Sequence, residues 1–224
     1  MKLMMYVYGN FRTMRIVLSL FLVFCTLRSL AQDADFNDYR KKTESFSRIY
    51  DKGIRSDLAS FTIGGIQESL GQTPLKRIPA VQYGPDFINY DSGDIKITIR
   101  TGIFNAGKHK LYYEAKHLVK IDNKPYYGNY GKVPGTNIAG ILVLAGKDTV
   151  QIPASAYGDL YNPGLTYRDA SGNVSSQDAV YLSNDKRNIY IYMLNRDDTG
   201  SYEVTWIIQD KKYLKRVIDY GFSQ

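Results

Sequence analysis

The chain has 224 residues, with 29 basic and 22 acidic side chains and a formal net charge of +7. Four of the basic residues and none of the acidic ones lie in the first 31 positions, so the rest of the chain carries only +3. This mild charge does not favour a nucleic-acid partner. The only cysteine, Cys25, also lies in that first segment, which excludes disulfides, thiol nucleophiles and cysteine metal sites from the rest of the chain. The remaining length is enough for one large domain, and we expect one.

The first 31 residues have the pattern of a cleaved export signal. Arg12 and Arg15 precede an apolar run over residues 16–27, and Ser29-Leu30-Ala31 then places small residues at the first and third positions. Signal peptidases cleave after such a pattern. We therefore expect cleavage before Gln32 and a periplasmic or secreted protein.

Two other interpretations of this segment are less favoured. A membrane anchor needs about 20 apolar residues, whereas Arg28 interrupts this run after about a dozen. Lipid attachment at Cys25 is disfavoured because the bulky Phe24 precedes it. We expect no stable membrane span after cleavage. Met14 opens a more regular signal than Met1 does, so both stay candidates for the natural start.

Apolar residues recur at helical spacing between positions 33 and 51, which predicts an amphipathic helix. These residues are Phe36, Tyr39, Phe46, Ile49 and Tyr50. Asp33 or Asp35 can cap its start, and Gly53 is placed to end it. Packing on the following domain is the simpler role for this helix, and a spacer or partner-binding role is the alternative. A short second helix is expected over residues 56–61.

Further along, the apolar period changes to two, which predicts strands. Residues 94–100 predict a strand with one buried face, and residues 111–121 predict a longer continuous strand of the same kind. The apolar run over residues 138–145 predicts a strand buried on both faces. Lys147-Asp148 then predicts a turn into a strand over residues 149–152.

The last third of the chain predicts an antiparallel meander. Strand-like residues 188–194, 201–209 and 212–220 are separated by short turn segments. Residues 157–177 are rich in Gly, Pro, Asn, Asp and Ser, which predicts a long loop. Trp206 is expected in the core, on one strand face with Tyr202, Val204 and Ile208.

Together these elements predict a mainly β fold, namely an antiparallel β-sandwich or open barrel with an N-terminal amphipathic helix. The predicted organisation is a signal peptide at residues 1–31, a helical segment at 32–63 and a β-rich domain at 64–224.

No pattern in the sequence predicts a catalytic or metal centre. Serine-nucleophile, phosphate-loop, dinucleotide and zinc-protease motifs are absent from it. On one continuous strand His109 and His117 would share an apolar face, while Glu114 would point the other way, so these residues do not converge. No third ligand completes a site, and we expect no metal and no cofactor.

The remaining charged groups have structural explanations. The carboxylate pairs Asp91 with Asp94 and Asp197 with Asp198 lie in turn-like segments, where Asp is favoured for its backbone hydrogen bonds. The basic run at residues 211–216 is expected to be a solvated strand edge.

Three tyrosines, Tyr126, Tyr127 and Tyr130, lie in a segment that Pro and Gly break and that Lys124 and Lys132 flank. Loop tyrosines give rigid amphipathic contact area, and lysines favour an acidic partner, so these five residues are the predicted ligand-binding site. In the alternative interpretation the rings fold back and cap an open end of the β domain.

The tripeptide Asp148-Thr149-Val150 resembles the short acceptor pattern of O-glycosylation in some exported Gram-negative proteins, which makes Thr149 a candidate acceptor.

These observations favour an exported, non-catalytic binding or interaction module of the cell envelope. Its expected partner is a glycan or an envelope protein. A hydrolase acting on cell-wall or other glycans and a periplasmic inhibitor or immunity-type protein are the two alternatives. The sequence does not indicate an oligomeric state.

Overall fold

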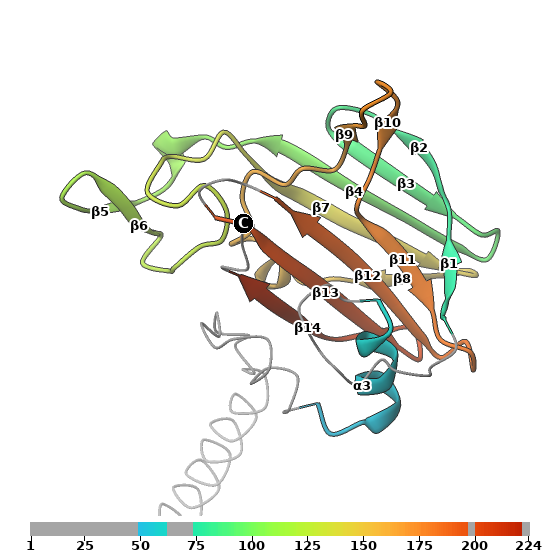
Figure 1. Ribbon diagram of the computed structural model, residues 1–224. Helices are drawn as coiled ribbons and strands as arrows, with labels where there is room; N and C mark the ends of the chain where they lie inside the picture. Colours follow the sequence, from blue (N-terminus) through green and yellow to red (C-terminus); the bar gives the residue numbers. More distant parts are fainter. Residues whose placement is uncertain (1–48, 62–73, 197–199, 221–224) are drawn as a thin grey trace, which may run out of the picture. The chain divides into compact units, whose positions relative to one another are not determined.

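Most of the described chain is organised as two five-stranded antiparallel sheets (Figure 1). The computed structural model describes residues 49–61, 74–196 and 200–220. Sheet 1 has the order β1, β11, β12, β13, β14, with the bounds Lys76–Ile78, Ala179–Leu182, Asn188–Asn195, Tyr202–Gln209 and Lys212–Tyr220. Sheet 2 has the order β2, β3, β4, β7, β8, with the bounds Ala80–Tyr83, Phe87–Asp91, Ile95–Ile103, Thr136–Ala145 and Asp148–Gln151.

The two sheets pack face to face around one apolar core. Pro79 alone separates β1 from β2, so the chain passes from one sheet to the other at this point. The core takes alternate side chains from both sheets, including Ile88, Ile97, Ile99 and Val143 of sheet 2 and Val180, Ile191, Val204 and Trp206 of sheet 1. The prediction of a mainly β, antiparallel fold is confirmed, and the two facing layers agree with a β-sandwich.

The C-terminal meander forms as predicted. Strands β12, β13 and β14 pair in sequence, and Asp210 and Lys211 make the last turn with φ values of 49° and 62°. Two successive residues of positive φ are typical of the tight hairpin turn that matches strand twist. Trp206 is fully buried in the inter-sheet core, as predicted, together with Tyr202, Val204 and Ile208.

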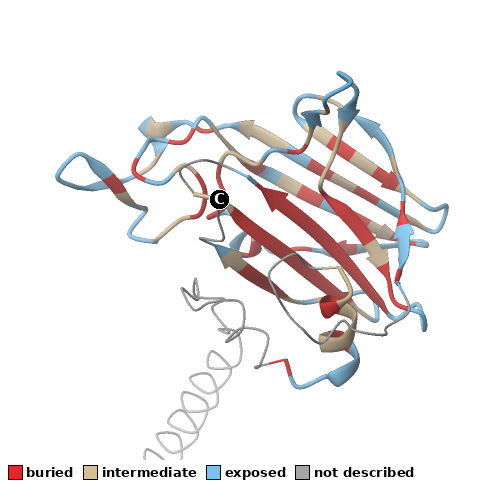
Figure 2. Ribbon diagram, viewed as in Figure 1, coloured by how far each residue is buried: buried red, intermediate tan, exposed pale blue. Residues whose placement is uncertain are grey.

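Much of the outer face of sheet 1 is buried as well, and helix α3 (Lys52–Ala59) packs against part of it (Figure 2). Ile54 and Leu58 of this helix pack against Tyr190, Ile207 and Val217 of the sheet. Burial on both faces explains why β12 consists entirely of buried residues.

The helix also corrects part of the sequence prediction. Asp51 begins α3 as its N-cap, accepting hydrogen bonds from the backbone N–H groups of Gly53 and Ile54 at 2.8 and 3.1 Å. Ile49 and Tyr50 are not helical, and Gly53 lies inside α3, so it does not end an earlier helix. The expected short helix exists but begins before residue 56. The rest of the predicted amphipathic helix, residues 33–48, and the signal segment lie outside the described residues.

Two strand predictions are wrong in their details. Residues 111–121 form a hairpin of β5 (Leu111–Glu114) and β6 (His117–Ile121), because Ala115 adopts a φ of 54° and reverses the chain. Strand β7 is buried on one face only, with Leu142 47% exposed on the other. The predicted loop at 157–177 contains a small hairpin of β9 (Tyr167–Arg168) and β10 (Val174–Ser175).

Candidate functional site

Residues 104–135 form a lobe between the paired central strands β4 and β7 of sheet 2. A hydrogen bond from the Phe104 N–H to the Gly135 carbonyl, at 2.9 Å, closes the lobe at its base. Within it lie the short 3-10 helix Ala106–Lys108 and the β5–β6 hairpin, which projects beyond the ends of the two sheets (Figure 1). We call this segment the basic lobe.

The basic lobe has its own small apolar core. Phe104, Leu118, Ile121 and Tyr161 are buried together, and Tyr126 packs against them. The edge of the Tyr161 ring meets both Phe104 and Tyr126, with ring centroids 5.2 and 5.7 Å apart. Because Tyr161 belongs to the chain after β8, it joins the apolar core of the lobe to the sandwich.

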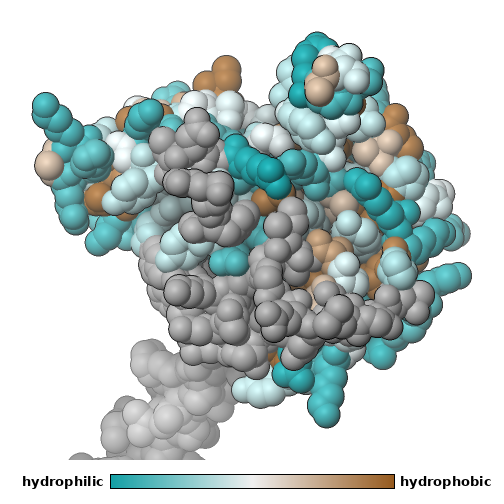
Figure 3. All heavy atoms as spheres, in the orientation of Figure 1, coloured by the Kyte–Doolittle hydropathy of each residue, from teal (hydrophilic) through white to brown (hydrophobic). Residues whose placement is uncertain are grey.

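Charge in the basic lobe is strongly unbalanced. Its six lysines are all exposed, and they are Lys108, Lys110, Lys116, Lys120, Lys124 and Lys132. Its only carboxylates are Glu114 and Asp122, so with neutral histidines the lobe carries +4, more than the +3 of residues 32–224 as a whole. Hydrophilic side chains cover most of the projecting end, with single apolar ones between them (Figure 3).

Asp122 is held by local contacts. Its Oδ2 lies 2.7 Å from His109 Nδ1, and its Oδ1 accepts a hydrogen bond from the Lys110 N–H at 2.8 Å. These two contacts, the histidine first, hold the pKa of Asp122 below its ordinary value. The His109 ring in turn stacks on Phe104 at a centroid distance of 4.7 Å.

The two histidines do not share an apolar strand face, so that prediction is wrong. His109 follows the 3-10 helix, and His117 is the exposed first residue of β6. The reason is the turn at Ala115, which places them on different elements of the lobe.

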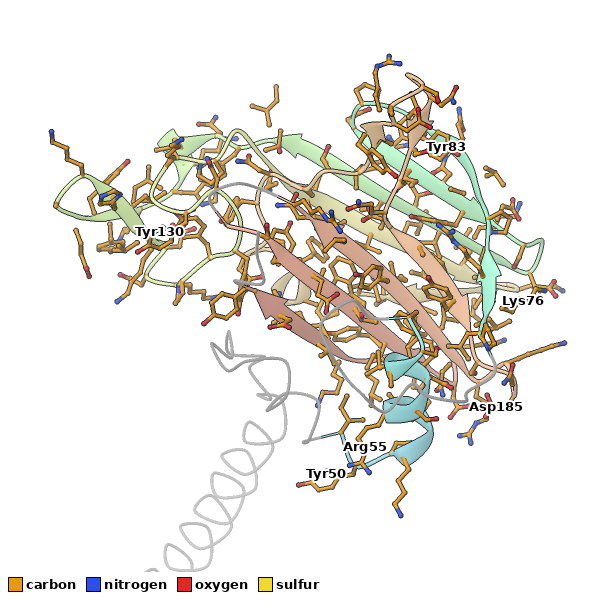
Figure 4. All side chains as sticks on the ribbon, in the orientation of Figure 1. Tyr50, Arg55, Lys76, Tyr83, Tyr130 and Asp185 are labelled. Carbon is orange, nitrogen blue, oxygen red and sulfur yellow. The ribbon has the colours of Figure 1, made fainter. Side chains whose placement is uncertain are left out.

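The structure separates the five residues of the predicted ligand-binding site. Tyr130 is 64% exposed (Figure 4), and Lys124 and Lys132 are exposed beside it in sequence. Tyr127 is only 4% exposed and packs its ring against those of Tyr202 and Tyr220. Tyr126 is half-buried, and its hydroxyl donates to the Leu118 carbonyl at 3.0 Å. Two of the three rings therefore cap the end of the sandwich and the lobe core, as in the alternative interpretation.

Sequence reasoning missed two exposed rings of the same lobe. Tyr112 and Tyr113 on β5 are 37% and 51% exposed. Tyr112 lies opposite Lys120 in the hairpin, so the two side chains project to the same face. The high content of Lys and Tyr across residues 108–132 is the feature of the sequence that could have indicated these two exposed rings.

A buried ion pair lies at the end of the sandwich near Tyr127. Arg216 and Asp159 are 6% and 8% exposed, and two hydrogen bonds of 2.6 and 2.7 Å join the guanidinium to the carboxylate. The expectation of a solvated edge is therefore wrong at Arg216. The carbonyl of Ala156 accepts hydrogen bonds from both Arg216 Nη1 and Trp206 Nε1. The Arg216–Asp159 ion pair is therefore connected to the core residue Trp206 through this carbonyl.

Asp178 is a second buried carboxyl, at the start of β11. Its Oδ1 accepts a hydrogen bond from the Leu194 N–H at 3.0 Å, in place of a backbone acceptor just before β11 begins beside β12. Its Oδ2 has no hydrogen-bond partner among the described residues. Complete burial raises the pKa of Asp178 well above its ordinary value, because burial disfavours the charged carboxylate relative to the neutral acid.

We expect Asp178→Asn to stabilise the protein increasingly as the pH rises. A pKa that is higher in the folded than in the unfolded chain gives stability that is complete below the unfolded value and is lost as the pH rises toward the folded one. Asparagine keeps the acceptor for Leu194 and never ionises. Denaturant unfolding of both proteins at several pH values checks this, and a stability difference independent of pH would contradict it.

Among the described residues, the carboxylate pairs and Thr149, which the sequence analysis also considered, do not form a site together. Asp91 is the last residue of β3, and its side chain accepts from the Gly93 N–H at 2.6 Å in the turn that follows and pairs with Lys96 at 3.3 Å. Asp197 and Asp198 lie outside the described residues. Within the part of the chain that the structure describes, no group of three or more His, Cys, Asp or Glu could hold a metal ion. Thr149 is exposed on β8, and its role as a glycosylation acceptor stays a prediction.

Comparison with known proteins gave no relative. No protein-family model, no curated protein and no solved structure matches this chain.

Proposed function

We propose that the protein is an exported, non-catalytic binding module of the cell envelope and that its basic lobe binds an acidic glycan. The observation that carries this proposal is the concentration of six exposed lysines and three exposed tyrosines on one projecting lobe with only two carboxylates. An acidic envelope protein is the alternative partner.

The fold itself does not need this arrangement. The apolar core of the lobe is complete without the lysine ammonium groups, and like charges placed close together repel one another. Tyr112, Tyr113 and Tyr130 leave large parts of their rings in water, although aromatic rings are stabilised by burial. A binding surface uses both features, because exposed rings give contact area at a low entropic cost and lysines attract anions.

Export is the second part of the proposal. Its support is the signal-like sequence of residues 1–31 and the lack of cysteine in residues 32–224, which suits a compartment where free thiols oxidise. In the described residues no helix is long and apolar enough to cross a membrane. Both the periplasm and the external medium agree with export, and in either compartment the protein would meet the glycans of the envelope.

The test is a charge reversal on the lobe. We expect the combined change of Lys116, Lys120, Lys124 and Lys132 to Glu to weaken binding to polygalacturonate on the order of 100-fold at low salt. Each reversal removes one attraction and adds one repulsion of a few tenths of a kcal/mol. Isothermal titration calorimetry measures the affinity.

A matched control reverses four exposed lysines outside the lobe, namely Lys76, Lys147, Lys186 and Lys212. Lys76 lies at the opposite end of the view from Tyr130 (Figure 4). Both variants change the net charge equally, so equal losses of affinity would show that net charge and not the lobe attracts the polymer. Unaltered binding in the lobe variant would refute the proposal.

A further inference from the structure

The only two histidines of the chain lie in the basic lobe, and each lies beside one of the lobe's only two carboxylates. His109 contacts Asp122 at 2.7 Å. His117 is the direct partner of Glu114 in the β5–β6 ladder, and opposite residues of an antiparallel pair project to the same side. Each imidazole is therefore placed beside a carboxylate that a positive charge on the ring would offset.

Both rings lie against neighbouring parts of the lobe. The His109 ring stacks on Phe104 at 4.7 Å. The His117 ring lies so close to Gly131 that a Cβ at that glycine would be 2.9 Å from its Nδ1, and Gly131 has a φ of +79° that glycine adopts without strain. This contact seats the loop that carries Tyr130 and Lys132 against His117.

Apart from Glu114 and Asp122, the charged groups around the two rings are lysines. Next to His109 lie Lys108, Lys110 and Asp122. Tyr161, whose pKa burial raises to about 12, packs against the same Phe104 ring on which His109 stacks. Around His117 lie Glu114, Lys116 and, from the loop against Gly131, Tyr130 and Lys132. Glu114 and Asp122 are thus the groups that a protonated histidine would offset.

We propose that protonation of His109 and His117 switches the basic lobe to tighter binding of a carboxylated or sulfated polymer. Neutral histidines leave two carboxylates to offset six lysines, and protonated histidines cancel those carboxylates and raise the lobe charge from +4 to +6. Histidine is the side chain that ordinarily changes charge between about pH 5 and 8. This inference rests on the proposed function and adds that acidification regulates it.

The test measures the affinity of the purified full chain for polygalacturonate and for dextran sulfate, at about pH 5.5 and about pH 8 and a fixed low ionic strength. Both polymers keep their charge over this range, so any change comes from the protein. We expect ~10-fold tighter binding at the lower pH for both polymers, from two added charges at the surface of the lobe.

Two variants assign the effect to the proposed groups. The double change His109→Gln and His117→Gln should bind at both pH values as the unmodified protein binds at the higher one. The double change Glu114→Gln and Asp122→Asn should bind at the higher pH as tightly as the unmodified protein does at the lower one. Thermal unfolding of each variant checks that the lobe is folded.

The possible failures are distinguishable. Binding that depends on the lobe lysines but is equal at both pH values would overturn the switch and leave the proposed function standing. A pH effect that survives in the His109→Gln and His117→Gln protein would overturn it as well. Absence of binding to both polymers at either pH would overturn the proposed function together with the switch.

Discussion

Replacement of Trp206 by alanine is expected to lower the free energy of unfolding by about 3 to 5 kcal/mol. Trp206 is fully buried between the two sheets, and its Nε1 donates to the Ala156 carbonyl at 2.7 Å. The change leaves a large cavity and removes the donor of this hydrogen bond, although Arg216 still donates to the same carbonyl. Urea unfolding followed by circular dichroism measures the loss.

Tyr130→Ala is the control for this aromatic truncation, because Tyr130 is 64% exposed. It should change stability by less than about 0.5 kcal/mol. Equal stability losses for Trp206→Ala and Tyr130→Ala would contradict the assignment of Trp206 to the core.

Replacement of Asp159 by alanine is expected to cost about 3 to 5 kcal/mol, because it leaves the buried Arg216 guanidinium without its counter-charge. The pair is 8% and 6% exposed, so water cannot take the place of the carboxylate without opening the end of the sandwich. Unfolding in urea at neutral pH measures this loss.

Arg187 and Asp210 form the matched control, since they also make two hydrogen bonds, of 2.9 and 2.7 Å, but both side chains are more than half exposed. Arg187→Ala should cost less than about 1 kcal/mol. Joint replacement of Asp159 by leucine and Arg216 by methionine should restore part of the stability lost in Asp159→Ala. Similar losses at Asp159 and Arg187 would refute the argument from burial.

The parts of the fold that the sequence predicted correctly are governed by local patterns. The meander over β12 to β14 has alternating apolar residues and a short polar turn, so strand positions and pairing follow from neighbours in sequence. The hairpin in residues 111–121 was missed because its turn uses Ala115, a residue without turn preference, and both arms keep the same alternation. The exposed face of β7 was missed because apolar content alone does not show which faces are covered.

The candidate site was harder to predict because its residues depend on distant partners. Arg216 is buried only because Asp159, 57 residues earlier, comes beside it. Tyr127 is buried by rings from β13 and β14. The lysines of the lobe were visible in the sequence, but their convergence depends on the closure of residues 104–135 between β4 and β7.

The most direct test of the central claim maps the binding surface by nuclear magnetic resonance. The backbone amide spectrum of the purified protein is recorded with increasing amounts of an oligogalacturonate. The account predicts that the largest shifts fall in residues 104–135, above all in the β5–β6 hairpin and around Tyr130 and Lys132, and that they diminish with added salt. Shifts confined to the sandwich, with the basic lobe unchanged, would contradict it.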